Sequence, residues 1–301
     1  MLCLTCMISL CACQETPVKK CTLQVFADSS LDKKLQLVGD KFQVTDGKEY
    51  DIQYTFDTSE NLLENIHTGE PCDLLLTSSE TLLHQLGDDD FISSDNTIEL
   101  LQSPLAMITS SEYPSLPLDV QSLFYQSDYA GEGDYYEDVE LEGYRPYADV
   151  LWDVTAEEEW QDDWNGQYEG LWIQESVPTI GIITTEQKEG QTVKSFLNQN
   201  GPAFDLLNQI GKIRSYDSKD SLLEAIRNRE VQIGFCSFPN TFDEKNIQTL
   251  RVYDGSDPTV SFYVSLFNGS ANRKDAKVFM NFLQGDHAKR FFEDFGFNFM
   301  R

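Results

Sequence analysis

The amino-acid sequence predicts a two-domain α/β fold, with mostly parallel sheets and helices on both faces of each sheet. From residue 22 onward, short β-like runs alternate with helical patterns, which is typical of this class. The length of 301 residues is sufficient for two modest domains. The composition, 40% hydrophobic and 24% charged, is that of a globular protein with a hydrophobic core.

In the first 112 residues, strand-like and helical patterns follow one another. Leu31, Leu35, Val38 and Phe42 recur at helical spacing, so they mark one face of a helix. The other expected elements are strands over 23–26, 50–56, 73–76 and 101–108, and a short helix marked by Leu62, Leu63 and Ile66. Asp73 opens an apolar strand, which indicates a structural role rather than that of a catalytic base.

The segment 116–176 differs from the rest of the chain. It contains all four Trp residues, and residues 128–175 hold 16 acidic residues and one basic residue, Arg145. We interpret it as an insertion, partly ordered because disordered segments are poor in aromatic residues. Calcium binding is a weaker alternative, since no EF-hand spacing is present.

Regular alternation resumes with a strand over 179–183. Leu222 to Ile226 then mark one face of a helix. The remaining expected elements are helices near 192–199, 203–210, 274–284 and 286–294, and strands over 231–235 and 260–267.

The first 21 residues indicate a secretion signal and a tether. Residues 1–13, MLCLTCMISLCAC, are apolar and small, and they end in a segment that resembles a bacterial lipobox. We therefore expect Cys13 to carry a lipid and the protein to be anchored to the cell membrane on its outer side. Unlike a usual secretion signal, the segment has no Lys or Arg before its apolar run, and a misassigned start codon would explain this difference. The alternative is a Cys-rich tail that is neither a signal nor an anchor.

Charge and cysteine content narrow the function classes. The net charge of −29 argues against binding to nucleic acid or to anionic membrane surfaces. The sequence contains no CxxC…CxxC arrangement, and its three His residues are far apart, so a protein-bound metal site is not expected. We expect Cys72 and Cys236 to be buried free thiols, although a disulfide between them remains open.

Two segments combine a strand, a hydroxyl residue and a helix start. They contain Ser30, in FADSSL, and Ser59, in FDTSENL. Helix N-termini offer free N–H groups and a positive dipole end, and so they bind anions. A single serine of this kind is more often only a helix cap. Two such turns can, however, open at the same carboxyl edge of an α/β sheet, which is where ligands bind. Two further helix starts lie in the second half of the chain. One contains Gln191 and Thr192, and the other contains Lys219. We expect both to face Ser30 and Ser59 from the opposite side of a cleft.

Several segments resemble the molybdate-binding proteins of ABC transporters. They are LQVFADSSLDKKLQLVGDKF, FDTSENLLENIHTGEPCDLLLTSS and, at the carboxyl end, KVFMNFLQGDHAKRFFEDFGF. The resemblance covers roughly residues 22–112 and 179–299. It implies a type II periplasmic-binding-protein fold, in which two domains close on a ligand in the cleft between them. Its domains would be residues 22–104 with 260–301, and residues 105–259.

By position, the resemblance makes Ser30 and Ser59 oxyanion ligands in the first domain. In the second domain it implies contacts near Gln191 or Thr192 and near Lys219. Two departures stand out: the family's Pro-Ala-Gly turn reads Glu189-Gly190-Gln191, and Ser237 replaces a ligand-contacting Tyr.

The sequence thus indicates the solute-binding lipoprotein of an ABC importer. The expected ligand is a tetrahedral oxyanion, molybdate or tungstate, and the expected partners are a permease and its ATPase, with the binding protein itself a monomer. The alternative is the same fold with a sulfur oxyanion or an organic molecule as ligand. An enzyme is the least favoured reading, because no nucleophile–base arrangement and no nucleotide-binding motif is present; no cofactor is expected.

Overall fold

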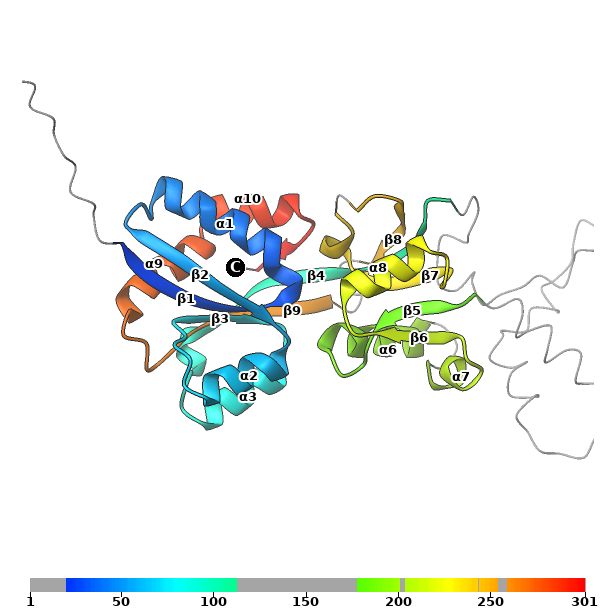
Figure 1. The fold of residues 1–301 in the computed structure, drawn as a ribbon, viewed down its shortest axis with the longest axis horizontal. Helices are drawn as coiled ribbons and strands as arrows, with labels where there is room; N and C mark the ends of the chain where they lie inside the picture. Colours follow the sequence, from blue (N-terminus) through cyan, green and yellow to red (C-terminus); the bar gives the residue numbers. More distant parts are fainter. Residues whose placement is uncertain (1–19, 113–177, 201–203, 243, 254–258, 301) are drawn as a thin grey trace, which may run out of the picture.

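The structure, a computed structural model, describes residues 20–112, 178–200, 204–242, 244–253 and 259–300. The lipidation candidate Cys13 and the predicted insertion at 116–176 lie outside these ranges. None of the helices in the described part of the chain is long and apolar enough to cross a membrane. The described residues form two α/β lobes side by side, with strands running between them (Figure 1).

The first lobe is built on three parallel strands whose carboxyl ends meet at one edge. In the register, Asp28 lies beside Asp57, and Ala27 lies beside Leu76. Each of these strands leads into a helix, so three strand-to-helix turns open at the same place. The elements are β1 (Cys21–Asp28), η1 (Ser29–Leu31), α1 (Asp32–Thr45), β2 (Tyr50–Asp57), α2 (Ser59–His67), β3 (Leu74–Thr77) and α3 (Glu80–Asp88).

The long strand β4 (Thr97–Ser110) follows η2 (Ser94–Asn96) and belongs to both lobes. Its first half, up to Pro104, pairs with β9 (Thr259–Leu266) in the first lobe. From Leu105 onward it pairs with β7 (Ile233–Ser237) and β8 (Ile247–Tyr253) in the second lobe. A short strand, β10 (Asn298–Phe299), also pairs with β4. The ten strands in the described part of the chain are thereby joined into one sheet.

The second lobe repeats the parallel arrangement. β5 (Ile180–Ile183) lies between β6 (Ile213–Tyr216) and β7 and pairs with both in parallel, while β7 and β8 are antiparallel to β4. The elements are β5 (Ile180–Ile183), α6 (Lys188–Asn200), α7 (Phe204–Gln209), β6 (Ile213–Tyr216), α8 (Lys219–Arg227), β7 (Ile233–Ser237), η3 (Phe238–Thr241) and β8 (Ile247–Tyr253); α9 (Arg273–Leu283) and α10 (Asp286–Asp294) return to the first lobe.

Apolar residues on both faces of the sheet explain this layering. Val25 and Ala27 of β1 pack in a core with α1, α9 and α10, whereas Phe26 packs on the opposite face with α2 and α3. In the second lobe α6 and α7 cover one face and α8 covers the other. The predicted α/β fold is confirmed; the pairing is mixed, because β4 and β9 run antiparallel to their neighbours.

Asp73 has the structural role that its position predicts. It is 4% exposed, and its carboxylate accepts hydrogen bonds from the Gln24 N–H at 2.8 Å and the Ser270 hydroxyl at 2.5 Å. The Asn272 side-chain amide donates to it as well, at 3.3 Å. These bonds connect β1, β3 and the turn before α9 at the amino end of β3, the edge opposite the three strand-to-helix turns.

We expect Asp73→Ala to lower the free energy of unfolding by about 2 kcal/mol, because its buried donors lose their acceptor. Ligand affinity should stay unchanged, since the site lies at the other end of β3. Urea unfolding measures the first effect, with the exposed Asp40 replaced by Ala as the matched control. A loss in Asp40→Ala equal to that in Asp73→Ala would contradict the explanation.

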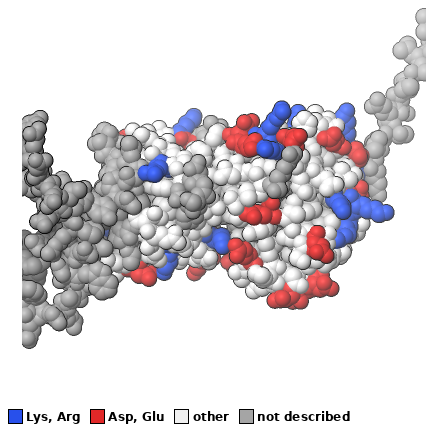
Figure 2. All heavy atoms as spheres, turned by 180° about the vertical axis from the view of Figure 1, so that it is seen from behind, with Lys and Arg blue, Asp and Glu red and all other residues white. Residues whose placement is uncertain are grey.

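Cys72 and Cys236 are buried free thiols, which confirms that expectation. They lie in different lobes, and burial raises the pKa of both thiols. On the face seen in Figure 2, acidic and basic side chains are interspersed, and much of the surface is uncharged. A large share of the net charge of −29 belongs to residues 128–175, outside the described part.

Candidate ligand-binding site

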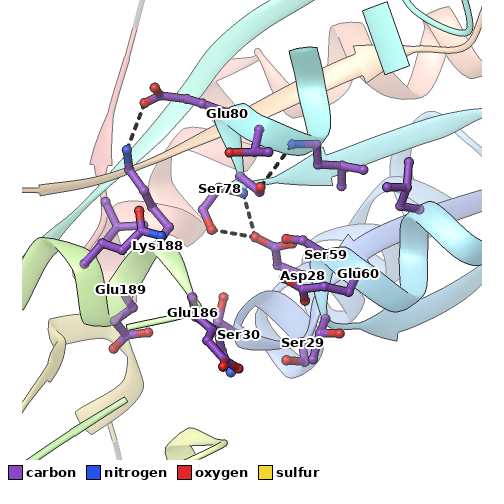
Figure 3. A pocket seen from close by; sticks show the side chains of 18 of the residues that line it. Asp28, Ser29, Ser30, Ser59, Glu60, Ser78, Glu80, Glu186, Lys188 and Glu189 are labelled. Atoms are coloured by element: carbon purple, nitrogen blue, oxygen red, sulfur yellow. Dashed lines mark hydrogen bonds and ion pairs between the residues drawn. The ribbon is translucent and has the colours of Figure 1, made fainter. Parts of the chain in front are cut away.

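A cavity of about 350 Å³ lies between the lobes, at the carboxyl ends of β1, β2 and β3. The first lobe contributes the three turns that follow these strands, and the second contributes the turn after β5 and the start of α6 (Figure 3). The parallel register of β1, β2 and β3 explains why side chains distant in sequence meet here.

Hydroxyl groups and helix starts dominate the wall from the first lobe. Ser30 lies in η1, and Ser59 opens α2. The helix caps are Thr58, whose hydroxyl accepts from Asn61 N–H at 3.4 Å, and Ser79, whose hydroxyl accepts from Leu82 N–H at 3.1 Å. α2 and α3 therefore both direct their positive dipole ends toward the cavity.

The wall from the second lobe is the amino end of α6, which begins at Lys188. Its close approach to the sheet depends on Gly190. A Cβ atom at this position would lie 2.3 Å from the carbonyl oxygens of both Ile183 and Thr184 at the end of β5. Lys188 reaches across the cavity, where its Nζ lies 3.1 Å from Glu80 Oε1 of α3.

Asp28 is the central side chain of the first-lobe wall (Figure 3). Its Oδ1 accepts from the Thr77 hydroxyl at 2.9 Å, and its Oδ2 accepts from the Ser78 N–H at 2.6 Å and the Ser78 hydroxyl at 2.7 Å. Burial raises the pKa of the Asp28 carboxyl, while hydrogen bonds from Ser78, Thr77 and Ser59 act in the opposite direction. A set of donors suited to an anion thus already surrounds a carboxylate of the chain itself.

A second polar cluster connects the lobes beside the cavity. Lys34 of α1 is 7% exposed, and its ammonium donates to the Ser30 carbonyl at 3.0 Å and to Asn240 Oδ1 at 3.3 Å. The Asn240 amide also contacts the carboxylate of Glu189 at 3.5 Å, and this carboxylate accepts from the Ser237 N–H at 2.5 Å. Asn240 therefore bridges a buried ammonium of one lobe and a carboxylate of the other.

Burial affects both charged members of this cluster. It lowers the pKa of Lys34 to about 8, an effect that the positive charge of Lys219 reinforces and that Asp32 and Glu189 oppose. Burial also raises the pKa of Glu189, while hydrogen bonds from Ser237 and Asn240 and the charge of Lys34 act to lower it.

The comparison with protein families decides the broad identity. Residues 23–298 match the model of the bacterial extracellular solute-binding protein family. The chain belongs to this family. The predicted location outside the cytoplasm is thereby confirmed at the level of the family. Comparison with curated proteins gives no match.

Solved structures show the fold of this solute-binding protein. The substrate-binding domain assigned to a molybdenum ABC transporter from Clostridium difficile is 18% identical, with a TM-score of 0.60 over 93% of this chain and 99% of that one. The periplasmic molybdate-binding protein of Azotobacter vinelandii is 14% identical, with a TM-score of 0.61 over 93% and 100%. The sulfate-binding protein SubI from Mycobacterium tuberculosis is 11% identical, with a TM-score of 0.62 over 92% and 86%. These matches confirm the two-domain periplasmic-binding-protein fold.

The structure brings together half of the predicted site residues of the solute-binding protein. Ser30, Ser59 and Gln191 all line the cavity. The other three predicted residues lie outside its lining. Thr192 is buried, and its hydroxyl donates to the Lys188 carbonyl at 2.9 Å. The Nζ of Lys219 lies 3.6 Å from Oδ1 of Asp32 in the other lobe. Ser237 is buried, and its N–H donates to the Glu189 carboxylate.

Four residues at or beside the cavity were not predicted from the sequence: Asp28, Ser78, Lys188 and Lys34. Asp28 had a detectable signal, because an acid at the carboxyl end of a buried strand and two residues from a candidate ligand serine is conspicuous. Among the described residues, six carboxylates and one lysine line the cavity, an unexpected balance for an anion-binding site: Asp28, Asp57, Glu60, Glu80, Glu186, Glu189 and Lys188.

Proposed function

We propose that this protein captures a small solute outside the cell membrane and delivers it to an ABC importer. Family membership and the solved transporter-associated structures support this role. The proposed partners are a permease and its ATPase, the proposed anchor is a lipid on Cys13, and the proposed oligomeric state is a monomer.

As the ligand we propose a tetrahedral oxyanion of the molybdate or tungstate type. The observation that carries this proposal is that Ser30 and Ser59 of the first lobe and Gln191 of the second line one cavity, into which α2, α3 and α6 all begin. A dehydrated oxyanion needs several such donors. Helix N-termini supply them without a charged side chain.

A different small solute is the second candidate, and two features of the cavity favour it. Its volume of about 350 Å³ exceeds the roughly 120 Å³ of four water-sized oxygens. Its six carboxylates also favour a solute that donates hydrogen bonds. An organic molecule with several hydroxyl or amine groups fits both features, whereas a sulfur oxyanion resembles molybdate in charge and shape and is favoured by neither.

Thermal unfolding with a panel of solutes separates the candidates, because a ligand that binds only the folded protein raises the melting temperature. The panel contains molybdate, tungstate, sulfate, thiosulfate, phosphate, and neutral and cationic organic solutes. A shift with molybdate or tungstate at micromolar concentration supports the oxyanion. A shift with an organic solute alone replaces it with the second candidate.

We expect Ser30→Ala and Ser59→Ala each to weaken oxyanion binding about tenfold to a hundredfold, since each removes a hydrogen bond to a charged ligand. Isothermal titration calorimetry with the oxyanion measures the loss. Ser195→Ala, at an exposed position of α6, is the matched control and should bind like the unmodified protein. Unchanged affinity in both cavity variants would remove these serines from the site.

A further inference from the structure

Asp28 already uses hydrogen-bond donors that an oxyanion would need. The Thr77 hydroxyl, the Ser78 hydroxyl and the Ser78 N–H all donate to its carboxylate. Ser59, one of the two proposed ligand serines, also bonds to it. A solute oxygen that accepts from the Ser59 hydroxyl therefore competes with the Asp28 carboxylate for its hydrogen and lies beside this carboxylate.

No cation in the described part of the cavity wall is placed to separate the two anions. Lys188 is the only basic residue in the described lining, and it is paired with Glu80. Lys34 directs its ammonium to the Ser30 carbonyl and Asn240. The other charged residues of the described lining increase the repulsion, because they are all acidic: Asp57, Glu60, Glu186 and Glu189.

Two anionic oxygens at hydrogen-bonding distance are stable only when a proton lies between them, as in pairs of carboxyl groups that share a site. We propose that Asp28 determines the specificity of this site, and that the oxyanion is captured together with one proton held between a ligand oxygen and the Asp28 carboxyl group. This inference rests on the proposed oxyanion function and adds the charge state in which the ligand is bound.

The proton has two sources, which different ligands distinguish. A fully ionised oxyanion such as molybdate, tungstate or sulfate brings none, so the site must take it from the solvent when the ligand binds. Hydrogen phosphate carries its own proton, donates it to the Asp28 carboxylate and needs none from the solvent. The raised pKa of the buried Asp28 carboxyl favours uptake in the first case.

Calorimetric titration in several buffers at one mildly alkaline pH tests the proposal, because the observed heat then varies with the ionisation enthalpy of the buffer. We expect the unmodified protein to take up about one proton with each molybdate ion and close to none with hydrogen phosphate. Its affinity for molybdate should increase as the pH falls. These readouts need no variant, so they stand even if a substitution at Asp28 prevents folding.

The variant Asp28→Asn keeps the shape of the side chain and removes its charge. It should bind molybdate at least about tenfold more tightly at alkaline pH, without proton uptake. Asp205→Asn, in the exposed Lys194 pair of the second lobe, should behave like the unmodified protein. Glu60→Gln removes an exposed carboxylate of the same cavity and should retain the proton uptake.

Two results would overturn the inference and leave the proposed function intact. One is oxyanion binding by the unmodified protein without proton uptake and without pH dependence. The other is a loss of proton uptake in Glu60→Gln equal to that in Asp28→Asn, which would point to the overall charge of the cavity. If neither the unmodified protein nor Asp28→Asn binds any oxyanion, the proposed oxyanion ligand fails together with this inference.

Discussion

Gly190→Ala is expected to lower both the free energy of unfolding and the affinity for ligand. The new methyl group would lie 2.3 Å from two backbone oxygens at the end of β5, which cannot turn away as a side chain does. α6 must therefore move away from the sheet, and Lys188, Glu189 and Gln191 move with it. Overpacking of this kind costs about 3 kcal/mol, at the upper end of the usual range.

Gly87→Ala in α3 is the matched control, because a Cβ there has no atom within 4 Å. It should leave the free energy of unfolding unchanged or raise it by up to about 1 kcal/mol, as Ala favours helices. Urea unfolding and ligand titration compare the two variants. Wild-type affinity in Gly190→Ala would show that the position of α6 does not determine binding.

The buried Lys34 predicts a stability that rises with pH. Its pKa is about 8 in the folded protein, against an ordinary value of 10.5. Below pH 8 the ammonium is charged in both states, so the cost of burying it is fully present. Between pH 8 and 10.5 the unfolded chain binds more protons, so the contribution of Lys34 to stability increases with pH, by roughly 3 kcal/mol in total.

Replacing Lys34 by Met isolates this contribution from other titrating groups. We expect the unmodified protein to gain stability relative to Lys34→Met as the pH rises from 7.5 to 10. The measured quantity is the difference between their free energies of unfolding. Lys33→Met, at the exposed neighbouring position, is the matched control for removing a lysine from α1. A constant difference for Lys34→Met would mean that Lys34 keeps its ordinary pKa.

Elements with a clear hydrophobic period were predictable from the sequence. Leu31, Leu35, Val38 and Phe42 mark the face of α1 that packs in the core. α3, β6 and β8 were not predicted from the sequence. β6 has only four residues, two of them exposed, and β8 is mostly half-buried, so the pairing of each with a neighbouring strand decides its conformation.

The site was predictable only where the signal is local. Ser30 and Ser59 stand at strand-to-helix turns, and the sheet register brings these turns together. Asp28 and Ser78 are 50 residues apart, and their contact depends on the parallel pairing of β1 and β3. The bridge from Lys34 to Asn240 depends on how the lobes meet, which no short segment encodes.

The exchange of partners along β4 has a mechanical consequence. Pro104 faces Thr259 of the first lobe, and the next residue, Leu105, faces Ser237 of the second. β4 is hydrogen-bonded to neighbouring strands both before and after the junction between Pro104 and Leu105. At the junction itself, Pro104 has no N–H to donate. A turn of one lobe against the other can therefore be taken up in the backbone torsion angles of two adjacent residues, with little loss of hydrogen bonding in β4.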